Sequence, residues 1–276
     1  MIAAQPRTGL IVAGPKDFSL EDTLTCGQCF RFFPQPDGSF EGVAQGRFLK
    51  IAQQNDSLLF YNTSPEEFEG FWRGYFDLDR DYGAIKQRLS QDKTLKKAAE
   101  YAPGIRILKQ DFWEALCCFI FSQNNNIKRI MGITERFCEA FGDLLPQGRH
   151  SFPSSDRIAP LSREDLCPLR CGFRADYLLD AARKVSSGEI DGPKIRGMPL
   201  EEARTVLQTI RGVGPKVAEC VLLYGLNRLD AFPVDVWIKR ALDRYYGGTL
   251  PNTIKEYAGI AQQYLFHYIR TAEKKA

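Results

Sequence analysis

Lys216 and Asp235 are the residues whose types and positions point most directly to chemistry. Lys216 follows Pro215 at the expected start of one helix, and Asp235 precedes an apolar helical pattern at the expected start of another. Two helix starts joined by a short helical hairpin can converge on one cleft. An amine beside a carboxylate is suited to attack on an electrophilic carbon with formation of a Schiff base. From the residues alone, a solvated surface lysine and an aspartate that only caps its helix stay open as alternatives.

The segment before these helices has the composition of an anion-binding hairpin. Arg211-Gly212-Val213-Gly214-Pro215 interrupts two apolar helical patterns. The two glycines permit a tight turn with outward-facing amides, and the dipole of the second helix adds to the attraction for an anion. We expect the amides of Gly212, Gly214 and Val217 to hold a DNA phosphate, because no side chain of the hairpin has to read a base.

The stretch GVGPKVAEC, followed by FPVDVW, resembles the helix-hairpin-helix DNA glycosylase superfamily, specifically its 8-oxoguanine DNA glycosylase branch. The common register of the hairpin, Lys216, Cys220 and Asp235 carries this resemblance. It implies a monomeric base excision repair enzyme that acts on double-stranded DNA containing 8-oxoguanine, with both glycosylase and abasic-site lyase activity. Lys216 and Asp235 would be its catalytic residues.

The same resemblance assigns four residues to the damaged base. Phe266 would stack on the everted purine, Cys220 would cover its other face, and Gln262 would bond its Watson–Crick edge. Gly27 would offer its carbonyl to N7, which carries a hydrogen in 8-oxoguanine and is an acceptor in guanine, so that a buried mismatch rejects guanine. Read without the resemblance, an aromatic at this spacing is core packing and the glycine is an ordinary turn.

Four further residues match the family positions that face the strand gap. Asn124 and Arg129 would lie by the cytosine left unpaired, Arg174 would partner the same base, and Phe173 would wedge the stack. From the residues alone, these are a turn, a solvated arginine and a core aromatic. Family members carry tyrosine at position 173, and vertebrate enzymes carry histidine where this chain has Trp237. We therefore expect weaker discrimination for cytosine opposite the lesion.

The fold class expected is α+β. Residues 1–100 read as a β-rich N-terminal domain with an antiparallel sheet, and residues 101–276 as the helical glycosylase region, with the hairpin at 200–226. Ser64-Pro65-Glu66-Glu67 is a capping box that should start a helix, and helical patterns follow over residues 81–102 and 127–141. The strands expected from short aromatic or β-branched runs are Gln28–Phe33, Ser39–Ala44, Arg47–Gln53 and Ser57–Asn62.

Composition narrows the class of protein without identifying it. The 276 residues are 44% hydrophobic and 26% charged with a net charge of +3, which predicts a soluble globular protein of about two domains. No stretch reads as a signal peptide or membrane span, so we expect no membrane partner and an intracellular location, cytoplasmic and nucleoid-associated, or nuclear in a eukaryote. The cysteines should then be reduced.

No metal and no cofactor are expected. Cys26 and Cys29 form a C-x-x-C and Cys167 with Cys171 a C-x-x-x-C, but neither has a second pair at zinc-finger spacing. No cysteine follows Cys220, so the iron–sulfur cluster that some members of the superfamily carry after the catalytic aspartate should be missing.

Two other functions stay open at this point. One is a glycosylase of the same fold for another damaged purine, alkylated or formamidopyrimidine. The other is a non-catalytic helix-hairpin-helix DNA-binding module, which would need the hairpin but neither Lys216 nor Asp235. Lys216 argues against an alkylated-purine glycosylase, which would share Asp235 but lack the lysine. Substrate turnover would separate an enzyme from a non-catalytic module.

Overall fold

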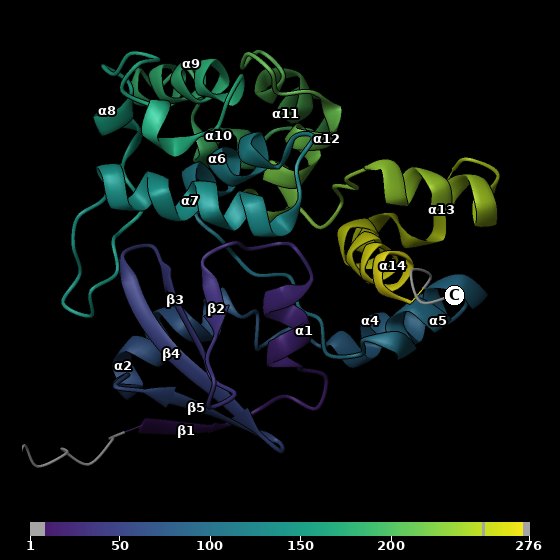
Figure 1. The fold of residues 1–276 in the computed structure, drawn as a ribbon. Helices are drawn as coiled ribbons and strands as arrows, with labels where there is room; N and C mark the ends of the chain where they lie inside the picture. Colours follow the sequence, from purple (N-terminus) through teal and green to yellow (C-terminus); the bar gives the residue numbers. More distant parts are fainter. Residues whose placement is uncertain (1–8, 250–251, 273–276) are drawn as a thin grey trace, which may run out of the picture.

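A computed structural model describes residues 9–249 and 252–272. Figure 1 shows three groups of elements: a sheet with its short helices, a block formed by α6 to α12, and a group made by α4, α5, α13 and α14. The outline confirms the expected α+β class. No helix of the described residues is both long enough and apolar enough to cross a membrane.

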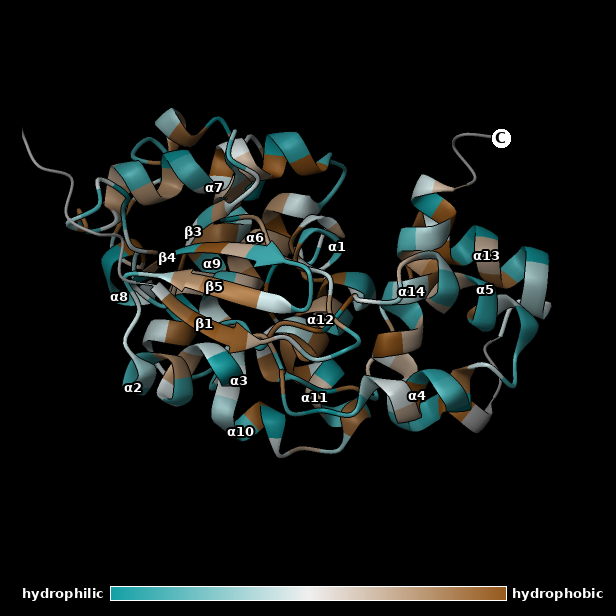
Figure 2. Ribbon diagram, turned by 90° about the horizontal axis from the view of Figure 1, so that it is seen from below, coloured by the Kyte–Doolittle hydropathy of each residue, from teal (hydrophilic) through white to brown (hydrophobic). Residues whose placement is uncertain are grey.

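The sheet is antiparallel, with its strands in the order β1-β5-β4-β3-β2. The side chains that alternate inward along it form an aromatic core with the helices beneath, and β1 and β5 are largely hydrophobic in Figure 2. Its strands and the short helices packed with it are β1 (Gly9–Ala13), α1 (Leu20–Thr25), β2 (Phe32–Pro34), β3 (Phe40–Ala44), β4 (Arg47–Gln54), β5 (Ser57–Tyr61), α2 (Pro65–Glu67), the π-helix η1 (Phe68–Trp72) and α3 (Arg73–Tyr75).

Three of the expected strands are confirmed, and the fourth, over Gln28–Phe33, is wrong for most of its length. Residues 26–31 are a loop because the buried Gln28 side chain bonds three backbone groups, two of them far along the chain. Its Nε2 donates to the carbonyls of Thr23 and Arg106, and its Oε1 accepts from the amide of Leu108. The expected helix at Ser64 is confirmed, since its hydroxyl accepts the amide of Glu67.

Helices build the rest of the molecule around a second hydrophobic core. Helices α4 and α5 belong to this core although nearly all of their residues precede residue 101, and α5 packs against α14. The elements are α4 (Tyr82–Leu89), α5 (Lys93–Tyr101), α6 (Phe112–Ser122), α7 (Ile127–Phe141), α8 (Ser155–Ile158), the 3₁₀ turn η2 (Cys167–Leu169), α9 (Arg174–Ser186), α10 (Gly192–Arg196), α11 (Leu200–Leu207), α12 (Pro215–Cys220), the π-helical turn η3 (Val221–Gly225), α13 (Val236–Tyr246), the 3₁₀ turn η4 (Asn252–Tyr257) and α14 (Ala258–Thr271).

Glu114 of α6 is a charged residue within the helical interior, 7% exposed. Burial raises the pKa of Glu114 to about 7, against the opposing effect of the Arg31 guanidinium. Arg31 is itself buried and approaches Glu135 of α7, with Nε 3.8 Å from Oε1. The interior therefore carries a carboxyl group that is easier to bury protonated than ionised.

We predict that Glu114 makes the stability of the fold depend on pH. Between its ordinary pKa of 4.5 and its folded value of about 7, the folded chain keeps a proton that the unfolded chain has released. Its stabilising contribution is thus complete below pH 4.5 and is lost as the pH rises through 7, by at most about 3 kcal/mol. Urea unfolding at several pH values should show a smaller fall in Glu114→Gln than in the wild type. Glu139→Gln, at an exposed position of α7, serves as control, and an unchanged pH slope in Glu114→Gln would contradict the prediction.

Candidate active site

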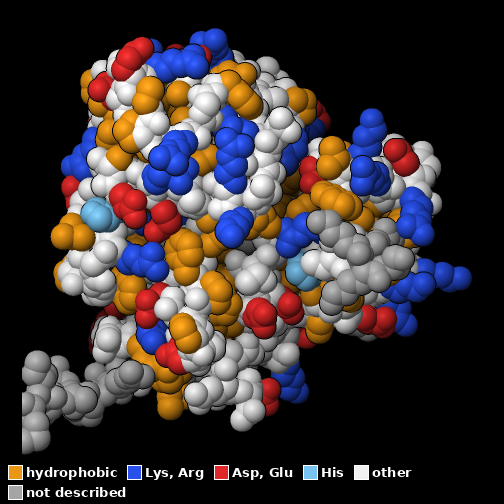
Figure 3. Space-filling view, viewed as in Figure 1, with side chains coloured by type: hydrophobic (Ala, Val, Ile, Leu, Met, Phe, Trp, Pro, Cys, Tyr) orange, Lys and Arg blue, Asp and Glu red, His pale blue; other side chains and the backbone are white. Residues whose placement is uncertain are grey.

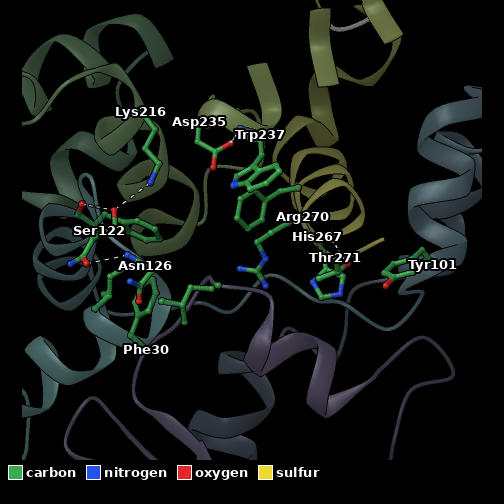
Figure 4. Close-up of a pocket in the computed structure, with 16 residues that line it drawn as sticks. Phe30, Tyr101, Ser122, Asn126, Lys216, Asp235, Trp237, His267, Arg270 and Thr271 are labelled. Atoms are coloured by element: carbon green, nitrogen blue, oxygen red, sulfur yellow. Dashed lines mark hydrogen bonds between the residues drawn. The ribbon is translucent and has the colours of Figure 1, made fainter. Parts of the chain in front are cut away.

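Lys216 and Asp235 line one cleft of about 780 Å³. Lys216 occupies the second position of α12, after Pro215, and Asp235 is the N-cap of α13, so two helix starts aim their side chains into the same space (Figure 4). The side chains of Lys216 and Asp235 therefore converge on one cleft, as the sequence predicted.

The Lys216 amine has neutral surroundings. Its Nζ donates to the hydroxyl of Ser122 at 3.4 Å and lies 5.1 Å from the centroid of the Phe119 ring. Among the described residues no carboxylate lies within ion-pair distance of it. An amine held by one hydroxyl and an aromatic face keeps its lone pair available once deprotonated. No pattern in the sequence indicated a role for Ser122 or Phe119, although Ser122 lies two residues before Asn124.

Asp235 combines helix capping with a place in the cleft. Its Oδ1 accepts the amides of Trp237 at 3.0 Å and Ile238 at 2.9 Å. Within the described residues its other oxygen has no donor, and the start of α13 favours a negative charge there. The capping interpretation is thus confirmed, and the capped carboxylate also lines the cleft; its catalytic role stays a prediction.

Glu219 fixes the loop that carries Asp235. It lies on α12, is 6% exposed, and accepts the amide of Phe232 at 2.5 Å while it pairs with Arg204 of α11. One buried carboxylate thus ties the helix of Lys216 to the chain leading to Asp235. Nothing in the sequence separated Glu219 from an ordinary surface glutamate, because its partners come from distant segments.

The residues expected around the base surround a smaller cavity that adjoins the cleft. It is lined by Gly27, Phe119, Lys216, Cys220, Tyr224, Pro233, Asp235, Gln262 and Phe266. Its volume of about 40 Å³ holds no more than a few water molecules, so the walls must separate to admit a purine. We call this cavity the base slot.

The walls of the base slot are braced by hydrogen bonds. The carbonyls on either side of Gly27 are taken, that of Cys26 by Gln263 at 3.3 Å and that of Gln28 by Gln110 at 2.8 Å. Among the described residues no donor reaches the Gly27 carbonyl between them. Burial raises the pKa of the Cys220 thiol, which keeps that wall neutral.

Tyr224 is a wall residue of the base slot. Its ring stacks on Phe119 with centroids 5.2 Å apart. Its hydroxyl donates to Oε1 of Gln263, and Oε1 of Gln262 lies 3.4 Å from the same hydroxyl. Tyr224 therefore links Phe119 to the two glutamines of α14.

The hairpin between α11 and α12 has the geometry that its glycines predicted. Gly212 has a φ of +79°, and its Cα faces the ring of Tyr177 so closely that a Cβ would lie 2.3 Å from that ring. The described residues offer no acceptor to the amides of Gly212, Gly214 and Val217. These amides stay available for an anion. Figure 3 shows Lys and Arg side chains gathered on the helical part above the sheet.

The residues assigned to the strand gap differ in their exposure. Phe173 is 45% exposed, Arg129 and Asn124 are exposed, and Asn124 has a positive φ of 46°. Arg174 is only 3% exposed and donates to the carbonyls of Gln123, Asn124 and Cys171. It therefore supports the turn that presents Asn124. Their contacts with DNA stay predictions.

The cysteines show no metal centre in the described part of the chain. All eight are free thiols, and no group of three or more His, Cys, Asp or Glu side chains is placed to hold a metal ion.

Comparison with known proteins agrees with this site. Residues 10–116 match the family described as 8-oxoguanine DNA glycosylase, N-terminal domain, and residues 117–263 match the HhH-GPD superfamily of base excision DNA repair proteins. The chain is 37% identical over 268 residues to an N-glycosylase/DNA lyase of Saccharomyces cerevisiae, covering 86% of this chain and 71% of that protein.

Two solved structures resemble the whole chain. One is MBOgg1 in complex with a low-affinity DNA ligand, at 42% identity and a TM-score of 0.90, covering 98% of both chains. The other is the Clostridium acetobutylicum 8-oxoguanine glycosylase/lyase, bound to double-stranded DNA with cytosine opposite 8-oxoguanine. It is 35% identical with a TM-score of 0.90, covering 99% of this chain and 98% of that one.

Fold, cleft and matches together define a helix-hairpin-helix base excision DNA repair enzyme, a DNA N-glycosylase and lyase. Within that class, the chain belongs to the 8-oxoguanine DNA glycosylase family.

We predict opposite results for alanine at the two hairpin glycines. Gly212→Ala should destabilise the protein, by about 1 to 2 kcal/mol from its backbone conformation alone and further from the clash with Tyr177, and should weaken duplex binding. Gly214→Ala should fold normally, because its φ is −91° and a Cβ there meets nothing within 4 Å. Thermal melting and duplex affinity measure both effects. Equal stability of the two variants would contradict this account of the hairpin.

Proposed function

We propose that the protein everts 8-oxoguanine from duplex DNA, excises it through a Schiff base on Lys216, and nicks the strand by β-elimination. The observation that carries the proposal is the single cleft in which Lys216 and Asp235 meet beside the base slot. Nucleophile, charge-stabilising carboxylate and base-recognition groups are thereby within the reach of one nucleotide.

Lys216 acts as the neutral amine. Its nitrogen attacks C1′ of the deoxyribose, the C1′–N9 bond breaks, and the bonding electron pair leaves with the base. Asp235 stabilises the positive charge that develops on the sugar. The nitrogen loses a proton and the sugar ring opens to a Schiff base. Removal of a proton from C2′ then expels the 3′-phosphate. No step requires a metal or an organic cofactor.

Recognition of the base follows from the walls of the slot. The Gly27 carbonyl accepts the N7 hydrogen that only the oxidised base carries, and Gln262, which lines the slot beside Tyr224, bonds the Watson–Crick edge. Phe266 and Cys220 cover the two faces of the ring.

The DNA around the lesion is held by groups outside the slot. The amides of Gly212, Gly214 and Val217 bind a phosphate, and Phe173 fills the gap in the stack. Asn124, Arg129 and Arg174 lie by the unpaired base. We propose that a monomer suffices, because every group in this mechanism comes from one chain.

Two other functions predict different results with the same duplexes. A glycosylase for alkylated or formamidopyrimidine bases would release those bases faster than 8-oxoguanine. A non-catalytic binding module would bind the duplex without releasing any base. Incubation of a duplex carrying one 8-oxoguanine, followed by strand analysis with and without alkali, separates these outcomes from the proposed one.

Lys216→Gln should abolish covalent trapping. Borohydride reduces a Schiff base to a stable link between protein and DNA, so the wild type should form an adduct with an 8-oxoguanine duplex and the variant should form none. Gel electrophoresis of the borohydride-treated mixture measures the adduct. Undiminished trapping in Lys216→Gln would overturn the assignment of the nucleophile.

Asp235→Asn should slow excision by a factor of about 10² to 10³ in single-turnover assays, because a carboxamide cannot offset the positive charge on the sugar. Asparagine is also a good N-cap, so α13 should keep its stability, which a thermal melt controls. Excision at nearly the wild-type rate would refute the electrostatic role of Asp235.

A further inference from the structure

We propose that Arg270 is a specificity-determining residue whose guanidinium donates a hydrogen bond to O8 of the everted base. The inference rests on the proposed function and deepens it. It adds a second contact that undamaged guanine lacks, independent of the contact between the Gly27 carbonyl and N7.

Arg270 is a cation of the active-site cleft that the mechanism leaves unused. It lies on the last turn of α14, one turn beyond Phe266, and it lines the same cleft as Lys216 and Asp235 (Figure 4). Lys216 must be neutral to attack. Arg270 is therefore the side chain of this lining that keeps a positive charge through the reaction.

One nitrogen of this guanidinium is buried without a partner among the described residues. Nη2 donates to the carbonyl of Thr25 at 3.3 Å, whereas Nη1 meets no acceptor in residues 9–249 and 252–272 and is shielded from solvent. A buried charged group with an unmet donor is costly to keep, and such groups are found where a ligand completes them. The missing partner must be an acceptor that enters the cleft.

Nη1 lies where the N7 side of a purine would dock. A Cβ built on Gly27 would be 3.1 Å from Nη1 and 3.6 Å from Cε1 of Phe266. Gly27 and Phe266 line both the cleft and the base slot, so Nη1 lies on the cleft side of the border between them. The guanidinium carbon lies 5.1 Å from the centroid of the Phe266 ring. The slot must widen for a purine to enter, and movement of Phe266 would uncover Nη1.

The geometry of the purine decides between its two carbonyls. O6 and O8 flank N7, on opposite sides. O6 belongs to the edge that faces Gln262, whereas O8 lies toward N9 and the sugar. The sugar must face Lys216 and Asp235, and Arg270 lines that cleft but not the base slot. With N7 on the Gly27 carbonyl, O8 is therefore the acceptor on the side of Arg270.

Arg270→Met tests the contact, because methionine keeps an unbranched side chain against Phe266 and removes every donor. The ligands are duplexes with a 2′-fluorinated nucleotide, which resists cleavage, carrying 8-oxoguanine or 8-thioguanine, and a duplex with a tetrahydrofuran abasic site. We expect the variant to bind the 8-oxoguanine duplex about tenfold more weakly than the wild type. The abasic duplex should be bound equally by both proteins. The loss of affinity should be smaller for the 8-thioguanine duplex. This base keeps O6 and the N7 hydrogen but carries sulfur, a weak acceptor, in place of O8.

Arg88→Gln is the matched control. It removes the same charge from an exposed position on α4, and it should bind every duplex as the wild type does. Borohydride trapping on abasic DNA and a thermal melt show whether Arg270→Met is folded and retains its nucleophile.

Three outcomes would overturn the proposal. Equal weakening on the abasic duplex would mean that Arg270 binds a phosphate. An equal loss of affinity for the 8-oxoguanine and 8-thioguanine duplexes in Arg270→Met would mean that Arg270 contacts O6 instead of O8. An unchanged affinity for 8-oxoguanine would leave Arg270 a packing residue. Failure of the wild type to release 8-oxoguanine from a cleavable duplex would instead refute the proposed function itself, so the two failures are distinguishable.

Discussion

The site depends on a buried carboxylate that joins two helices. Glu219 accepts the amide of Phe232 and pairs with Arg204, so α11, α12 and the chain leading to α13 are fixed relative to one another. Without this link, Asp235 would be placed only by its own helix. Loss of one partner of a buried ion pair is strongly destabilising. The pair formed by Glu219 and Arg204 therefore holds the segments it joins in one arrangement. Glu219 thus restricts movement of the chain leading to Asp235 relative to the helix of Lys216.

Each catalytic side chain also takes its place from local backbone chemistry. Pro215 starts α12 without losing a hydrogen bond, and the cap made by Asp235 starts α13. Helix starts leave free amides and a partial positive charge, so the same local feature suits the hairpin to an anion and stabilises the carboxylate of Asp235. The positive φ of Gly212 brings the hairpin against Tyr177 and thereby against α9.

Helices and caps that depend on interactions between neighbouring residues were predicted correctly from the sequence. The helix over residues 127–141 and the cap at Ser64 follow from side chains that bond their own neighbours, and both are found. The strand expected over Gln28–Phe33 failed because Gln28 bonds groups far along the chain. No sequence pattern indicated a role for Glu219 or Arg270. The reason is the same, because the residues around them come from distant segments that meet only in the folded chain.

Unsatisfied donors occur in two kinds of surroundings. In the described part of the chain, Arg31 has buried donors without partners, and the nearby Glu114 and Glu135 offset its charge. By contrast, the buried Nη1 of Arg270 borders the cleft, and the hairpin amides and the exposed ring of Phe173 lie where the proposed complex places a phosphate and the base stack. In that complex, bound DNA would relieve the cost of leaving these groups unpaired or exposed. That relief favours complexes in which phosphate, base stack and everted base are engaged together, and a duplex that satisfies only one of the three gains correspondingly less.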